Sequence, residues 1–157
     1  MPRRHPFSRP SGRLPRRWLF TDARLGDAVL AAAAALPPGS GIVIRDDDRA
    51  PGDRWRLVRR LARIAKTRSL LLLLAGPPAL ARRWGAGGVH LRQHQAKQAV
   101  EARRLGLIVS MPVHDPREAR AARRARADLA FVSPLHPTRS HPGAPAVGRA
   151  AWLGLAR

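Results

Sequence analysis

The 157-residue sequence contains no cysteine, which excludes a disulfide-stapled scaffold and a thiol nucleophile. It also contains no tyrosine, and aromatic residues make up only 4% of the chain, so side chains that could stack on nucleic-acid bases are scarce. No apolar run approaches the length of a membrane span. What remains is enough chain for one domain, with 45% hydrophobic residues to form its core.

The formal net charge is +20, and nearly all of the basic residues are arginine. Such a charge raises nucleic acid as a partner. However, the arginines are spread over helical faces rather than gathered in one block, so we do not expect specific nucleic-acid binding. Non-specific association with a steep salt dependence stays as an alternative.

The first 17 residues contain six arginines and four prolines and show no apolar periodicity. We therefore predict a disordered basic tail over residues 1–17 and a single domain over residues 18–157. Asp22, Arg24 and Asp27 interrupt the apolar segment that a signal peptide would need, so we expect a cytoplasmic protein without a membrane anchor.

Short apolar runs alternate with helical patterns six times along the chain. This alternation is typical of a parallel sheet with right-handed crossovers, and the five consecutive leucines predict one strand that is buried on both faces. No Gly-x-Gly-x-x-Gly follows the first strand and no Walker loop is present, so dinucleotide and nucleoside triphosphate sites lack their signatures. The predicted strands are residues 18–20, 41–44, 70–74, 89–91, 107–111 and 129–132, and the predicted helices are residues 25–36, 53–66, 79–84, 95–105, 116–126 and 148–155.

Two folds fit this alternation, an open doubly wound sheet and a (β/α)8 barrel. A complete barrel needs at least about 200 residues, so the chain would be two units short. The loop after the last strand is rich in proline, hydroxyl, histidine and arginine groups. Thr138, Arg139, Ser140 and His141 could surround an anion such as a phosphate, although an ordinary connecting loop is equally consistent with the pattern. We interpret residues 46–48, three consecutive aspartates, as a solvated turn rather than a metal cluster.

Several stretches resemble the thiamine phosphate synthases and their TenI-like relatives. Residues 85–93, Gly-Ala-Gly-Gly-Val-His-Leu-Arg-Gln, resemble the family's Gly-Ala-Asp-Gly-Val-His-Leu-Gly-Gln. Residues 127–140 resemble its Ala-Asp-Tyr-x-x-x-Gly-Pro-x-Phe-Pro-Thr-x-Thr-Lys loop, and shorter matches occur at residues 18–22, 44–45 and 113–114. The resemblance implies an α/β fold of the thiamine phosphate synthase type, a (β/α)8 TIM barrel that is incomplete, with about six β/α units present.

The family reaction joins a hydroxymethylpyrimidine diphosphate to a thiazole phosphate, and Mg²⁺ assists the departure of pyrophosphate. The resemblance implies that Arg45 reaches the diphosphate and that Thr138 and Ser140 keep the hydroxyls of the thiazole phosphate loop, in which His141 replaces a lysine. The family's two Mg²⁺-binding aspartates fall at Gly76 and Gln95, which supply no carboxylate. We therefore expect no metal site and no encoded cofactor.

His114 matches the histidine that resembles the acid/base of a TenI-like thiazole tautomerase, which needs no metal. Histidine suits proton transfer near neutral pH, although a purely structural hydrogen bond at the strand end is also consistent. For His90, inside a predicted strand, we expect a packing role.

Three functions follow: a thiamine phosphate synthase, for which the lost aspartates make full activity doubtful, a metal-independent tautomerase, or a non-catalytic phosphate-binding or regulatory module. In each case the partners are small phosphorylated thiazole or pyrimidine compounds. Because the first and last strands lack neighbours, we also expect a homo-oligomer or aggregation.

Overall fold

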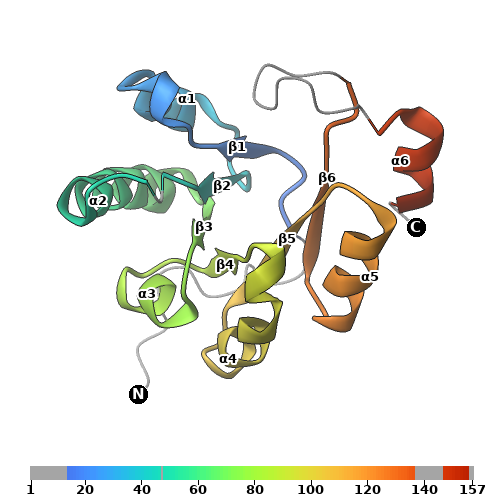
Figure 1. The fold of residues 1–157 in the computed structure, drawn as a ribbon. Coiled ribbons are helices and arrows are strands. Elements are labelled where there is room, and N and C mark those ends of the chain that lie inside the picture. Colours follow the sequence, from blue (N-terminus) through green and yellow to red (C-terminus); the bar gives the residue numbers. More distant parts are fainter. Residues whose placement is uncertain (1–13, 47, 137–146, 156–157) are drawn as a thin grey trace.

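The computed structural model describes residues 14–46, 48–136 and 147–155, and its strands and helices alternate along the chain (Figure 1). Six strands form one sheet in their order along the sequence, and each strand is parallel to its neighbours. The strands are β1 (Trp18–Phe20), β2 (Gly41–Ile44), β3 (Leu71–Ala75), β4 (Gly88–His90), β5 (Ile108–Val113) and β6 (Leu129–Val132). The α-helices are α1 (Ala28–Ala35), α2 (Pro51–Arg68), α3 (Pro78–Arg83), α4 (Ala99–Arg104), α5 (Pro116–Arg124) and α6 (Arg149–Leu155). The predicted parallel sheet of six β/α units is therefore confirmed.

The sheet curls into an open barrel, and the helices lie on its outer side (Figure 1). Side chains alternate along each strand, so strands contribute to two apolar clusters, one against the helices and one inside the barrel. In β3, Leu72 and Leu74 pack with the helices, whereas Leu71 and Leu73 pack inside the barrel, and none of the four is more than 4% exposed. The leucine run is thus a strand buried on both faces, as the sequence predicts.

Two glycines let the inside of the barrel pack closely. A Cβ atom on Gly41 would lie 2.3 Å from the ring of Trp18, and one on Gly88 would lie 2.4 Å from the carbonyl oxygen of Ile108. Neither separation is compatible with a real carbon contact. Both positions therefore need glycine, because the neighbouring atoms leave no room for a side chain.

The first and last strands, β1 and β6, are the edges of the described sheet. Their inward rings meet across the barrel: the ring centroid of Phe131 lies 5.2 Å from that of Trp18 and 4.8 Å from that of Phe20, both edge to face. These rings therefore shield one another from water, although both edge strands lack a neighbouring strand on one side within the described sheet. Trp152 of α6 also covers the β6 edge, since its Nε1–H donates to the carbonyl of Val132 at 3.1 Å.

Two of the predicted helices begin with a 3₁₀ segment instead of an α-helix. Asp22 caps a separate 3₁₀ helix, η1 (Ala23–Leu25), and Gly26, with a φ of +49°, separates it from α1. The helix predicted at residues 95–105 is a 3₁₀ segment, η2 (Gln93–Gln98), that continues into α4. Before β1, Leu14 packs inside the barrel and Pro15 accepts a hydrogen bond from the indole of Trp18 at 2.8 Å. Among the described residues, none of the helices has the length and apolar character that a membrane crossing requires.

Candidate functional site

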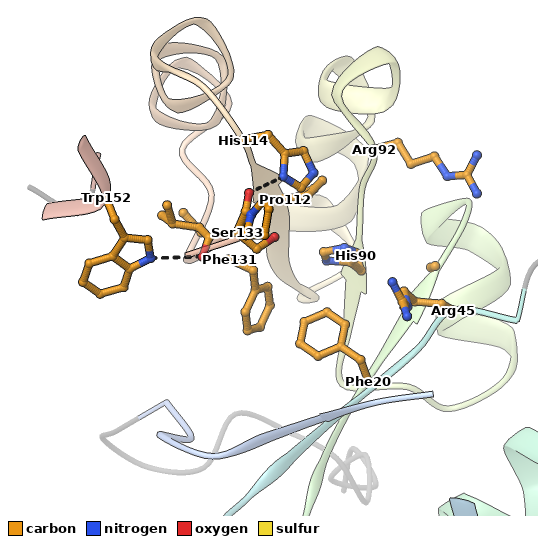
Figure 2. A pocket seen from close by; sticks show the side chains of 13 residues that line it. Phe20, Arg45, His90, Arg92, Pro112, His114, Phe131, Ser133 and Trp152 are labelled. Carbon is orange, nitrogen blue, oxygen red and sulfur yellow. Dashed lines mark hydrogen bonds between the residues drawn. The ribbon is translucent and has the colours of Figure 1, made fainter. Parts of the chain in front are cut away.

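A cavity with a volume of about 710 Å³ lies at the carboxyl ends of the strands (Figure 2). Parallel α/β folds place their sites at this end, because the loops that follow the strands converge there. Arginine and histidine are the charged or titratable residue types that line it, and no aspartate or glutamate is among its described lining residues. Its lining residues include Phe20, Arg45, Ala75, His90, Arg92, Pro112, His114, Phe131, Ser133 and Trp152.

The imidazole of His114, the first residue after β5, lies at the mouth of this cavity (Figure 2). Its Nδ1 lies 2.5 Å from the backbone carbonyl oxygen of Ser133, which follows β6. A carbonyl oxygen can only accept a hydrogen bond, so Nδ1 carries the proton and the neutral ring has its basic lone pair on Nε2. The prediction that His114 belongs to the site thus has a geometric basis, and the ring has the tautomer that a general base needs.

The backbone at His114 is fixed by the start of α5. The N–H of His114 donates to Oε2 of Glu118 at 2.7 Å, and the N–H of Glu118 donates to Oδ1 of Asp115 at 2.8 Å. These reciprocal bonds resemble a capping box and satisfy donors at the helix start. The hydrogen bond from the Glu118 amide is the main reason that the pKa of Asp115 lies below its ordinary value of 3.8.

Arg45, directly after β2, brings a guanidinium group to the same cavity. Its Nε donates to the carbonyl of Thr21 at 3.2 Å, and its Cζ lies 5.6 Å from the ring centroid of Phe20. One terminal nitrogen lies 3.5 Å from Asp22, which makes a shorter ion pair of 2.6 Å with Arg24. Hydrogen bonds from the side chain and then the backbone of Arg24 hold the pKa of Asp22 well below its usual range. Asp22 therefore stays ionised and helps to orient Arg45.

His90 is 7% exposed and forms part of the cavity floor. Its Nδ1 lies 2.9 Å from the hydroxyl of Ser110, and that hydroxyl donates to the carbonyl of Val89 at 3.0 Å. The hydroxyl proton is thereby used, so Nδ1 of His90 donates. Phe20 and Phe131 hold the ring edge to face. His90 is packed, as predicted, and its ring also lines the cavity.

The interpretation of the three aspartates as a solvated turn is wrong for Asp46, which is 4% exposed. Its carboxylate accepts hydrogen bonds from the hydroxyl of Thr21 and, at 2.7 Å, from Nε of Arg49. A buried carboxylate needs such partners, because desolvation otherwise disfavours its charge. The sequence could not show that Thr21, twenty-five residues away, supplies one of them.

Four of the predicted anion-binding residues lie outside the described residues, namely Thr138, Arg139, Ser140 and His141. The structure does describe both ends of that loop. The N–H of Val147 donates to the carbonyl of Pro134 at 2.9 Å, so the two ends meet beside the cavity that Pro134 lines.

The positions at which the family resemblance places Mg²⁺ ligands do not fit a divalent cation. Gly76 has no side chain, and a Cβ atom there would lie 3.8 Å from a guanidinium nitrogen of Arg54. The amide oxygen of Gln95 accepts from the backbone N–H of Arg92 at 3.0 Å. A neutral amide already bonded to the backbone, and a glycine beside a guanidinium group, are poor substitutes for the carboxylates that hold Mg²⁺.

Sequence reasoning missed four residues that line the cavity: Phe20, Arg92, Phe131 and Trp152. Arg92 had a usable signal, because it is the first charged residue after the fourth strand. Phe20 and Phe131 lie at alternating positions of edge strands, and their inward direction depends on register. Trp152 follows a long loop, so nothing in the sequence indicates that α6 returns to this cavity.

The fold and the site together define a class: an open parallel β/α barrel with a basic, partly aromatic cavity at the carboxyl ends of its strands. A family profile described as "Thiamine monophosphate synthase" matches residues 18–155, and the chain belongs to this family. The match includes β1, every strand that contributes to the cavity, and α6.

Individual relatives agree with this assignment. The chain is 34% identical over 128 residues to "Thiamine-phosphate synthase" of Chromobacterium violaceum, covering 80% of this chain and 61% of that protein. It is 29% identical over 139 residues to "Putative thiamine-phosphate synthase 2" of Aquifex aeolicus, covering 86% of this chain and 75% of that protein. The solved structure of a thiamine phosphate pyrophosphorylase from Pyrococcus furiosus superposes with a TM-score of 0.69 at 20% identity, over 86% of this chain and 65% of that one, which supports the fold. The chain thus spans about three fifths of the first relative's length.

Proposed function

We propose that the chain binds a phosphorylated thiazole precursor of thiamine and that His114 moves a proton on it, as in a TenI-like tautomerase. The observation that carries this proposal is the contact between Nδ1 of His114 and the carbonyl of Ser133 at 2.5 Å, in a cavity lined by cationic and aromatic side chains. The aromatic rings suit a flat heterocycle, and the guanidinium of Arg45 suits its phosphate.

The chemistry that this geometry supports is a proton transfer between two atoms of the ligand. Nε2 of neutral His114 accepts a proton from a ligand carbon, and the Ser133 carbonyl stabilises the resulting imidazolium through the Nδ1–H bond. The imidazolium then returns a proton to a different ligand atom. One proton leaves and one arrives, so the step needs no metal, no leaving group and no second substrate.

Replacing His114 with asparagine tests this role. We expect His114→Asn to lower the isomerisation rate of a thiazole phosphate tautomer by roughly 10²–10⁴-fold, with little change in binding, because general acid–base catalysis contributes about that much. Isomerisation is measured by ultraviolet absorbance, since the two tautomers differ in conjugation, and binding by calorimetry. His94→Asn, at an exposed position of η2, is the matched control and should keep the wild-type rate. Equal rates in the two variants would contradict the proposal.

The second candidate function is the synthase reaction itself, which the names of the relatives and the retained Arg45 favour. It is tested with the full chain, pyrimidine diphosphate, thiazole phosphate and Mg²⁺. Turnover at an ordinary enzymatic rate would assign the synthase and would show that Mg²⁺ finds ligands other than those considered above. Saturable binding of thiazole phosphate without either reaction would assign a non-catalytic binding or regulatory module.

A further inference from the structure

A buried arginine lies behind the cavity wall. Arg54 of α2 is 6% exposed, and one of its terminal nitrogens donates to the carbonyl of Arg45 at 3.0 Å and to the carbonyl of Ala75 at 2.5 Å. Those carbonyls lie at the carboxyl ends of β2 and β3, so the guanidinium ties together the two strand ends that precede Arg45 and Gly76. Its Cζ also lies 5.8 Å from the ring centroid of Trp84, within reach of a cation–π contact.

This arrangement places a positive charge where a metal-binding carboxylate would otherwise lie. Gly76 is next to the Arg54 guanidinium, as its Cβ distance of 3.8 Å shows, and its φ of +129° disfavours any side chain. A fixed cation therefore lies behind the cavity wall, beside the ends of β2 and β3, although Arg54 is not among the described residues that line the cavity. A fixed cation can offset phosphate charge as a bound metal does, without recruiting an ion.

A second arginine lies at the cavity rim. Arg92 follows β4 and lines the central cavity together with Arg45, and both also line the adjoining hollow at the ends of β1 and β2. Figure 2 shows the two guanidinium groups on the same side of the cavity, opposite Trp152. Two guanidinium groups that share one rim offer the forked donors that phosphate oxygens accept.

The adjoining hollow also contains carboxylates, and these weaken the local positive charge only in part. Asp46 is paired with Arg49 at 2.7 Å, and Asp22 is paired with Arg24 at 2.6 Å. Asp48 is exposed. The first two carboxylates are thus partly neutralised, and Arg45, which lies 3.5 Å from Asp22, shares the rim with Arg92, so an incoming anion would meet two guanidinium groups there.

We propose that Arg45 and Arg92 form a phosphate site that works without a divalent metal, and that Arg54 is a positioning residue that holds the β2 end from which Arg45 projects. The proposal rests on the proposed function for its ligand class, a phosphate ester, and it adds two residues, Arg92 and Arg54, to the binding site. His114 has no part in holding the phosphate.

The test is calorimetric titration of the full chain with inorganic pyrophosphate at an ionic strength of about 0.15 M, in EDTA and again with Mg²⁺. We expect saturable binding in EDTA at one site per chain, and at least a tenfold loss of affinity in Arg92→Gln. Arg83→Gln removes the same charge from an exposed position on α3 and should change affinity less than twofold. Binding only in the presence of Mg²⁺, or equal losses in the two variants, would overturn the proposal.

To test the role of Arg54, a measurement must distinguish an effect on the position of Arg45 from an effect on the folding stability of the chain. We expect Arg54→Met to weaken pyrophosphate binding severalfold, and Arg54→Lys, which keeps a charged donor, to restore most of the affinity. Leu61→Ala, a core change on the same helix, is the control for destabilisation. If Arg54→Met lowers affinity no more than Leu61→Ala at a similar melting temperature, Arg54 is structural only.

These outcomes differ from those that test catalysis. His114→Asn should bind pyrophosphate with wild-type affinity even where it abolishes isomerisation. Pyrophosphate binding without isomerase activity in the wild-type chain would contradict the proposed function and leave the arginine site standing. Isomerase activity together with pyrophosphate binding that requires Mg²⁺ would overturn the arginine site and leave the proposed function standing.

Discussion

Three carboxylates near the cavity pair with groups two to four residues away in the sequence, whereas Arg45 and His114 are held by backbone carbonyls 24 and 19 residues away. Asp22 pairs with Arg24, Asp46 with Arg49, and Glu118 accepts from the backbone of His114. Short loops at strand ends make these local pairs possible, because the chain turns at once from strand to helix. The same local pairs decide how individual residues respond to pH.

Asp115 provides a pH prediction with a definite sign. Its pKa is lower in the folded chain than the ordinary value of 3.8, chiefly because it accepts the Glu118 amide hydrogen bond. The stability that it contributes is therefore complete above about pH 4 and is lost as the pH falls through the lowered folded-state value. Asp115→Asn keeps an acceptor for the cap but cannot titrate.

The measurement is the melting temperature of wild type and Asp115→Asn at steps between about pH 6 and pH 2. We expect the difference in melting temperature between wild type and Asp115→Asn to shrink as the pH falls through the folded-state pKa of Asp115. At neutral pH, the melting temperature of Asp115→Ala should be lower than that of either protein, because this variant loses the helix cap. A difference between wild type and Asp115→Asn that does not change with pH would show that this carboxylate does not titrate as described.

The sequence could indicate which residues lie at the cavity only where position along a strand defines their placement. His114 and Arg45 directly follow strands, and both line the cavity, while their roles stay predictions. Arg54 was not predictable, because an arginine inside a helix rich in exposed arginines looks the same in sequence whether it is buried or not. Its burial depends on the carbonyls of β2 and β3, which the helix meets only in the folded chain.

At the scale of elements, the packing of β4 between β3 and β5 depends on a single glycine. A Cβ atom on Gly88 would lie 2.4 Å from the backbone carbonyl of Ile108 and 2.5 Å from a methyl group of Leu73, and the backbone atom cannot move aside cheaply. We expect Gly88→Ala to lower the free energy of unfolding by roughly 3 kcal/mol or more, as severe overpacking does.

Gly39→Ala is the comparison, since nothing lies within 4 Å of its Cβ position and only its φ of +78° opposes a side chain. That backbone preference costs about 1–2 kcal/mol. Urea unfolding of both variants measures the two values. A smaller loss for Gly88→Ala than for Gly39→Ala would mean that β4 and β5 can separate without cost.

Strands were easier to predict than helix starts. Three strands, β1, β2 and β6, have the predicted bounds, because each is a short apolar run with a sharp end. Residues 95–98 were predicted as the start of a helix over residues 95–105, yet Gln95 bonds to the backbone at Arg92 and residues 93–98 wind as a 3₁₀ helix. Propensity alone does not distinguish these two helix types.

For the molecule as a whole, the sequence predicted the number of β/α units and their parallel order, and the structure confirms both. It did not predict how the open side is arranged. That arrangement depends on Trp18, Phe20 and Phe131, which come from opposite ends of the sheet and meet only once it has curled. Oligomerisation through the strand edges stays a prediction.

The contact between the rings of β1 and β6 makes this side of the barrel a seam. Inner strands such as β3 are hydrogen-bonded on both sides, whereas β1 and β6 are bonded on one side within the described sheet and touch each other through side chains. Separating the rings of Trp18 and Phe20 from that of Phe131 breaks no backbone hydrogen bond. Local opening fluctuations of the barrel should therefore be most frequent along this seam. Amide hydrogen exchange followed by mass spectrometry should be faster in β1 and β6 than in β3.

Phe20 and Phe131 are also walls of the cavity, so the seam and the ligand share two side chains. A ligand that fills the cavity must contact both rings and would hold the two ends of the sheet together. We therefore expect bound ligand to slow exchange in β1 and β6 while leaving β3 unchanged. Equal slowing of amide exchange in all six strands would indicate global stabilisation instead, and the seam would then be as rigid as the rest of the sheet.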